Sequence, residues 1–119
     1  MTLNELMKAN ITRAQKWHNG DMNEWSTLEW AAAMAGEAGK ACNAAKKLKR
    51  LECKIASINE PGRHYEDVED AKEEVALEVA GTIIYAILLA ARIGITDIEE
   101  LIRYKFNKTS IKYDFEDRL

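Results

Sequence analysis

Two glutamates, Glu37 and Glu78, stand alone in uncharged, small or apolar surroundings and are the residues best placed to do chemistry. Glu78 is the only charged residue in the stretch 75–91, and Glu37 lies in the alanine-rich stretch 31–38. A carboxylate on a core helix is costly unless a proton, a partner or a metal neutralises it. Two such acids on two apolar segments therefore predict a site inside a helical bundle.

Helical spacing places one further residue on the same helix face as each of these two acids. Residues i and i+3 share a helix face, so Lys40 accompanies Glu37 and Gly81 accompanies Glu78. Carboxylates at all four positions would repel one another and would need hard divalent cations, most naturally Mg²⁺ with oxygen ligands and waters. A magnesium ion held in this way can orient a triphosphate and generate a hydroxide.

The elements that position these residues are predicted to be four helices in one domain spanning 1–119, an all-α fold without strands. Three helix starts carry a capping box, in which a hydroxyl residue is followed three positions later by Glu. The expected helices run from Thr2 to about Trp17, from Ser26 to about Glu52, from Tyr65–Asp67 to about Ile93, and from Thr96 to about Tyr113.

The breaks between these helices follow from their turn-forming residues. The segment His18–Asp21 is predicted to be a turn, and Gly94 is expected to stop the third helix. Trp25 is expected to act as a hydrophobic staple before Ser26. The segment Cys53–His64 holds the only proline and is predicted to be a loop of about a dozen residues, which is long for a compact domain.

The third predicted helix is apolar around most of its circumference after Val75. One small bundle normally hides less apolar surface than this, so the pattern favours a second subunit that covers part of it. A monomer with this helix at its centre is the alternative.

Composition excludes several classes of protein. The chain has 119 residues, 47% of them hydrophobic, a net charge of −3 and a pI near 5.5, which gives no reason to expect nucleic-acid binding. Glu78 argues against a membrane-spanning reading of the long apolar run. Cys42 and Cys53 lack metal-ligand spacing and are expected to be reduced thiols, so we expect a cytoplasmic protein.

Three segments carry motifs in order: 36–43 is similar to a GExGE motif, 74–85 to an ExxD motif with its apolar run, and 105–113 to a C-terminal K-x-N-type segment. Together they resemble the motifs of the MazG-like nucleotide pyrophosphohydrolases of the all-α NTP pyrophosphatase superfamily. The likeness spans residues 13–115. It implies a four-helix bundle completed by oligomerisation, as a homodimer or homotetramer.

The resemblance also implies a reaction, the hydrolysis of (d)NTPs to the monophosphate and pyrophosphate with Mg²⁺ or Mn²⁺. Glu37 and Glu78 match catalytic metal ligands of that family. Lys40 stands where the family has its second Glu, and Gly81 stands where it has Asp, which leaves a notch in place of a side chain. The four positions therefore carry a net charge of −1, from two glutamates and one lysine, where four carboxylates would give −4.

The same resemblance assigns substrate contacts. Aromatic and histidine side chains at positions like Trp17 and His18 line the base pocket, and lysines like Lys105 and Lys112 contact phosphate oxygens. The full set of substrate-binding candidates is Trp17, His18, Asn43, Lys105, Asn107, Lys112 and Tyr113. The competing readings are a surface position for His18 beside its glycine turn, and a solvated basic face near a helix C-terminus.

Three functional hypotheses follow. The first is a nucleoside triphosphate pyrophosphohydrolase weakened by Lys40 and Gly81, with Asp70, Glu74 or Asn43 as recruited ligands. The second is a catalytically inactive member of the same fold that binds a nucleotide or a protein, with the ammonium of Lys40 in place of the metal. The third is a helical interaction module whose two core acids are salt-bridged.

Overall fold

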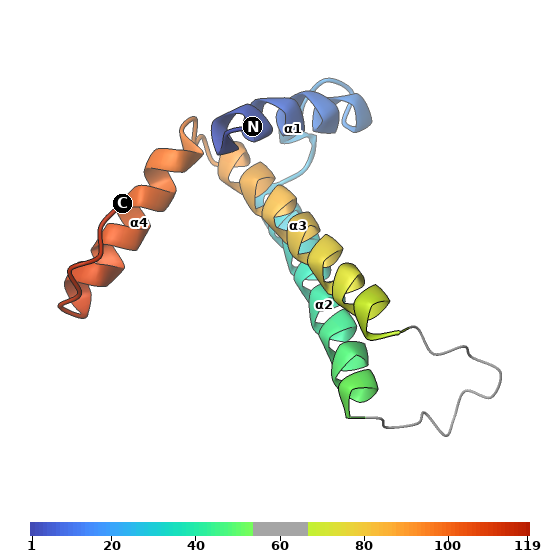
Figure 1. Cartoon of the computed structure of the whole chain (residues 1–119). Helices are drawn as coiled ribbons and strands as arrows, with labels where there is room; N and C mark the ends of the chain where they lie inside the picture. Colours follow the sequence, from blue (N-terminus) through green and yellow to red (C-terminus); the bar gives the residue numbers. More distant parts are fainter. Residues whose placement is uncertain (54–66) are drawn as a thin grey trace. The chain divides into compact units, whose positions relative to one another are not determined.

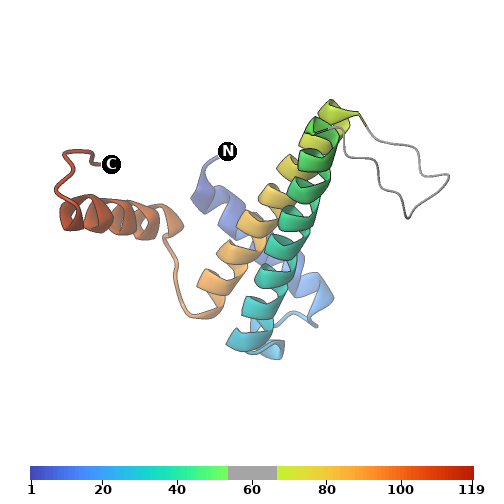
Figure 2. The same ribbon diagram turned by 90° about the horizontal axis from the view of Figure 1, so that it is seen from below.

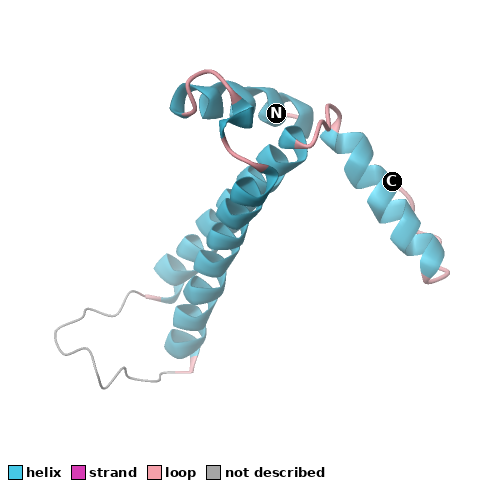
Figure 3. Cartoon of the chain, turned by 180° about the vertical axis from the view of Figure 1, so that it is seen from behind, coloured by secondary structure: helices cyan, strands magenta, loops and turns pink. Residues whose placement is uncertain are grey.

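The computed structural model describes residues 1–53 and 67–119, and this part of the chain is helical. Its elements are α1 (Leu3–Trp17), the short 3-10 helix η1 (Met22–Glu24), α2 (Thr27–Glu52), α3 (Val68–Arg92) and α4 (Ile98–Lys112). No strand occurs in the described ranges (Figure 3). The predicted all-α class and its four α-helices are confirmed.

The first two helices begin as their capping boxes predict. Thr2 Oγ1 accepts a hydrogen bond from the N–H of Glu5 at 3.0 Å, and the Glu5 carboxylate accepts from the N–H of Thr2 at 2.7 Å. Ser26 and Glu29 form the same reciprocal pair at 3.2 and 2.7 Å. Each cap satisfies backbone donors that the helix itself leaves unpaired, a contribution of about 1 kcal/mol per cap.

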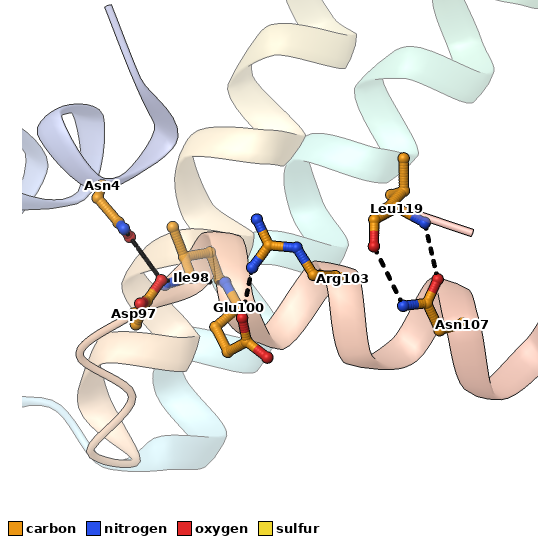
Figure 4. Close-up of polar contacts among 7 residues, drawn as sticks. All are labelled: Asn4, Asp97, Ile98, Glu100, Arg103, Asn107 and Leu119. Atoms are coloured by element: carbon orange, nitrogen blue, oxygen red, sulfur yellow. Dashed lines mark hydrogen bonds and ion pairs between the residues drawn. The ribbon is translucent and has the colours of Figure 1, made fainter.

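The predicted start of the last helix at Thr96 is wrong by one residue. The N-cap of α4 is Asp97, whose Oδ1 accepts from the N–H of Glu100 at 3.0 Å. Asn4 in α1 selects this register, because its amide donates to Asp97 at 3.0 Å and accepts from the N–H of Ile98 at 2.9 Å (Figure 4). The hydrogen bond from Asn4 is also the main reason that the pKa of Asp97 is lowered.

The ends of α3 agree with the sequence where the structure describes them. The predicted start at 65–67 lies partly outside the described residues, and the Oδ1 of Asp67 accepts from the N–H of Asp70 at 2.8 Å. Gly94, at φ +97°, follows the end of the helix and donates its N–H to the carbonyl of Ala91 at 3.0 Å. The predicted loop at 53–64 lies, apart from Cys53, outside the described residues.

The described residues fall into two compact units. Unit 1 comprises residues 1–30 and 87–119, and unit 2 comprises residues 31–86. The core of unit 1 joins α1, the end of α3 and the start of α4, and its buried members are Met7, Ile87, Ala90 and Ile98. Burial of these apolar side chains is what holds α1 and α4 to the end of α3.

Unit 2 is a pair of antiparallel helical segments from α2 and α3, which lie side by side in two views (Figures 1 and 2). Ala44 and Ala71 are its buried apolar residues. Small side chains at such positions allow the two helices to approach closely. Lys47 Nζ lies 3.2 Å from Glu74 Oε1 and links the two helices.

The middle of α3 leaves large apolar side chains uncovered in the single chain. Leu77 is 65% exposed, and Val79 and Ile83 are each 47% exposed. In the described part of the chain, α3 is the helix long and apolar enough to cross a membrane by length and composition alone. Glu78 lies between Leu77 and Val79 in the sequence, near the middle of this helix. Placing an ionisable side chain in the interior of a lipid bilayer costs free energy, which disfavours a membrane-spanning helix.

Candidate functional site

Three of the predicted site positions on α2 and α3, Glu37, Lys40 and Gly81, come together in unit 2. The Glu37 carboxylate reaches α3 at Gly81, one helical turn beyond Glu78. A Cβ placed on Gly81 would lie 2.6 Å from Glu37 Oε2. The antiparallel pairing of two helices thus brings together positions 37 and 81, which are far apart in the sequence.

Lys40 takes the other oxygen of Glu37. Its Nζ donates to Glu37 Oε1 at 3.1 Å. The Glu37 side chain is 19% exposed, whereas the Lys40 side chain is 62% exposed. The ion pair therefore joins a mostly buried carboxylate to a solvated ammonium. The ammonium is able to leave Glu37 without the loss of many other contacts with the protein.

Electrostatics at this site favour the charged form of Lys40. The pKa of Lys40 is raised above its ordinary value of 10.5, first by the hydrogen bond to Glu37 and then by the negative charges of Glu37 and Glu78. Lys40 is accordingly protonated throughout the physiological range, and its charge opposes the binding of a second cation. The expectation that Lys40 neutralises these acids is consistent with this arrangement.

Sequence reasoning assigned no role to Tyr85, a half-buried residue of α3 on the same helix face as Glu78 and Gly81. The signal was present in the sequence, since Glu78, Gly81 and Tyr85 follow i, i+3, i+7 spacing and therefore share one helix face.

The acids proposed as recruited ligands are placed differently. Glu74 is engaged by Lys47 at 3.2 Å, and Asp70 and Asn43 are exposed. Within residues 1–53 and 67–119, no three His, Cys, Asp or Glu side chains form a group that could hold a metal ion. Glu37 and Glu78 are therefore the acids on which a metal at this site would depend.

A Mg²⁺ ion at this site would be weakly held and hydrated, because the described residues do not form a complete protein cage. Mg²⁺ is commonly bound by one or two carboxylates, with waters and substrate phosphates as its other ligands. Glu37 and Glu78 supply such carboxylates, and the exposed Lys40 side chain is able to leave Glu37. The ion pair competes with the metal, so the expected affinity is low.

His18 lies in a buried aromatic cluster of unit 1, so the reading of it as a surface residue is wrong. Its ring centroid is 4.6 Å from that of Trp25 and 5.1 Å from that of Trp30. Its Nδ1 lies 3.4 Å from a Glu24 carboxylate oxygen. Trp25 and Trp30, 4.8 Å apart, form the hydrophobic staple that the sequence suggests before Ser26.

Trp17 differs from these aromatic residues because it is 66% exposed at the end of α1. The guanidinium of Arg13 lies 5.8 Å from its ring centroid. An exposed indole with a neighbouring cation offers a stacking surface for a flat, negatively charged ligand. The predicted contact between Trp17 and a nucleobase stays a prediction.

The candidates on α4 fall into two groups. Lys105 and Lys112 are exposed, and the Nζ of Lys112 lies 5.4 Å from the ring centroid of Tyr113. Asn107 already has partners, since its amide donates to the carbonyl of Leu119 at 3.3 Å and accepts from the N–H of Leu119 at 2.9 Å (Figure 4). Asn107 therefore tethers the segment that follows α4.

An open pocket of about 290 Å³ also lies in unit 1. Its lining residues are Leu3, Glu99, Ile102, Arg103 and Leu119. None of the predicted site residues lines this pocket, and most of its walls are apolar.

No family profile, curated protein or solved structure matches this chain.

Proposed function

We propose that this protein is a MazG-like nucleoside triphosphate pyrophosphohydrolase whose hydrolytic activity is weakened by Lys40 and Gly81. The observation that carries the proposal is the approach of Glu37 on α2 to Gly81 on α3, with Lys40 bonded to the same carboxylate and the charge of Glu78 raising the pKa of Lys40. These are the four positions at which the resemblance expects metal ligands.

The proposed reaction is (d)NTP plus water to (d)NMP plus pyrophosphate. Glu37 and Glu78 would hold the magnesium ion. When bound, the ion would polarise a phosphate group of the substrate and activate a water molecule. Lys40 would leave Glu37 on metal binding, and its ammonium, still near the acids, would face the phosphate oxygens. The roles of Trp17 and the α4 lysines in holding the nucleotide rest on the resemblance.

A second candidate function is nucleotide or protein binding without hydrolysis, in a cytoplasmic protein of the same fold. The observation that favours it is the 3.1 Å ion pair between Lys40 and Glu37, which satisfies the acid without a metal. A binding protein with this site needs no Mg²⁺ for its stability.

Pyrophosphate release from a panel of NTPs and dNTPs, with Mg²⁺ or Mn²⁺, separates the two candidates. For the first, we expect slow turnover that Glu78→Gln lowers at least about tenfold, as loss of a metal ligand should. The matched control is Glu69→Gln, which makes the same change on the same helix at a side chain that is 82% exposed.

Three results of this experiment have different meanings. Turnover lost in Glu78→Gln and kept in Glu69→Gln supports hydrolysis at the acid pair. No turnover, together with nucleotide that raises the melting temperature, supports the binding protein. If the protein shows no turnover and nucleotide does not raise its melting temperature, both nucleotide functions are contradicted. The helical interaction module is then the remaining hypothesis.

We further propose that a second copy of this chain covers exposed apolar side chains of α3. Val79 and Ile83, each 47% exposed, lie on one face of α3, and Leu77, 65% exposed, lies on another, so large apolar side chains are uncovered on more than one side of the helix. Glu78 disfavours lipid as the covering medium. The assembly would be a homodimer or homotetramer.

Light scattering during gel filtration tests this assembly. The 13.5 kDa chain is expected to elute with at least twice its own mass, and Leu77→Glu with Ile83→Glu is expected to shift it to the monomer. A helical, monodisperse monomer at all concentrations would overturn the proposal. Solubility only in detergent would point to a membrane instead.

A further inference from the structure

Gly81 forms a notch in α3 that the Glu37 side chain fills. A Cβ on residue 81 would lie 2.6 Å from Glu37 Oε2, 3.5 Å from Cδ and 3.9 Å from Cγ. The first of these separations is far below van der Waals contact, so the observed position of Glu37 requires glycine at 81. Glycine in the middle of a helix is unfavourable by itself, which makes this close approach the physical role that can be assigned to it.

Lys40 bonds to the other oxygen of the same carboxylate. Its Nζ bonds to Oε1 at 3.1 Å, while Oε2 is the oxygen that enters the notch. The two oxygens of Glu37 therefore have different neighbours, one on its own helix and one on α3. The i,i+3 spacing of Glu37 and Lys40 keeps the ammonium on the side of the helix that faces this notch.

We propose that Lys40 and Gly81 act together as a latch that holds Glu37 against α3 and withholds its carboxylate from a divalent cation. This inference rests on the proposed function, because it regulates the same acid pair. It makes Gly81 a positioning residue for Glu37. Lys40 and Gly81 are the two positions that depart from the family motif. Because both act on the Glu37 side chain, their effects are expected to depend on each other.

The latch is tested without metal by measuring melting temperatures. In a Glu37→Ala background the notch is empty, so Gly81→Ala should raise the melting temperature by about 4 °C, the gain expected for glycine to alanine in a helix. With Glu37 present, the new Cβ displaces its carboxylate, and the gain should be clearly smaller. Gly39→Ala is the matched control, because a Cβ there meets nothing within 4 Å.

The second arm measures Mn²⁺ affinity by electron paramagnetic resonance on the intact chain. Gly81→Ala displaces the Glu37 carboxylate from the notch and should tighten Mn²⁺ binding several-fold. In a Lys40→Met background Glu37 is already free, so the same substitution should change the affinity less than about twofold. Gly39→Ala should leave the affinity unchanged in both backgrounds.

The two arms separate failure of the latch from failure of the proposed function. Equal melting-temperature gains for Gly81→Ala with and without Glu37 would overturn the latch and leave the proposed function standing. A second outcome is that the gain from Gly81→Ala depends on Glu37 but no variant binds Mn²⁺. This outcome would overturn both the idea that the latch keeps Glu37 from a cation and the metal-dependent reaction. The inference is supported if the effect of Gly81→Ala on the melting temperature depends on Glu37 and its effect on Mn²⁺ affinity depends on Lys40.

Discussion

The variant Lys40→Glu with Gly81→Asp is expected to bind Mg²⁺ on the order of a hundredfold more tightly than the natural chain and to gain NTP hydrolysis. It changes the charge of the four site positions from −1 to −4. It also removes the ammonium that competes for Glu37. Both effects increase the attraction for a divalent cation at the acid pair.

The structure shows how the larger side chain at position 81 is accommodated. The Cβ of the introduced aspartate would occupy the space now held by the end of the Glu37 side chain, 2.6 Å from its Oε2. That end is flexible, and in this variant Lys40 no longer restrains it. Glu37 is therefore expected to rotate out of the notch without movement of either helix.

The double variant is also expected to depend on metal for its stability. Four carboxylates without a cation repel one another, so the metal-free variant should melt below the natural chain. Added Mg²⁺ should then raise its melting temperature in proportion to the logarithm of the metal concentration. The natural chain, with its ion pair in place, should respond only weakly.

Calorimetric titration with Mg²⁺, melting curves and pyrophosphate release check this prediction. The control is Lys46→Glu with Gly39→Asp, which makes the same residue changes at exposed positions of α2. Adjacent residues on a helix do not face each other, so the carboxylate introduced at position 39 would point away from the Lys40 side chain. A double variant that folds well but gains neither affinity nor metal-dependent stability would contradict the site assignment.

Replacing Trp30 by alanine is expected to cost about 3 to 5 kcal/mol in the free energy of unfolding. Trp30 is 1% exposed and is the largest fully buried side chain in the described residues. Its ring contacts Trp25 and His18, and its Nε1–H donates to the carbonyl of Met22 at 3.1 Å. Alanine would leave a cavity and an unpaired carbonyl in unit 1.

Urea unfolding followed by circular dichroism measures this loss. Trp17→Ala is the control, because this indole is 66% exposed and its removal should change the unfolding free energy by less than about 0.5 kcal/mol. Trp30→Phe should fall between the two, since it keeps much of the ring volume and loses the hydrogen bond. Equal stabilities for Trp30→Ala and Trp17→Ala would mean that the aromatic cluster does not support the fold.

The sequence by itself determined the helices and most of their ends. The capping boxes at Thr2 and Ser26 and the stop at Gly94 depend on backbone groups within about five residues, so their patterns can be read locally. The apolar surroundings of Glu37 and Glu78 also predicted that these acids belong to one site. Their spacing set which side chains share a face with them.

Only the tertiary structure decided which partner each polar side chain takes. Thr96 and Asp97 are each followed three residues later by Glu, and the contact of Asn4 with Asp97 selects the second register. Asn107 tethers Leu119, a pairing that its motif does not predict. These choices depend on the positions of helices that are distant in the sequence, whereas a sequence pattern reports only the geometry within one helix.

The same physical reason explains the site. Lys40 was expected near the acids because i,i+3 spacing fixes it beside Glu37. The sequence also predicted a notch at Gly81, but it did not predict that Glu37 would fill it, because that contact exists only where α2 meets α3. Local hydrogen bonding decides where the helices begin and end, and the approach of two helices decides what the carboxylate on one of them does.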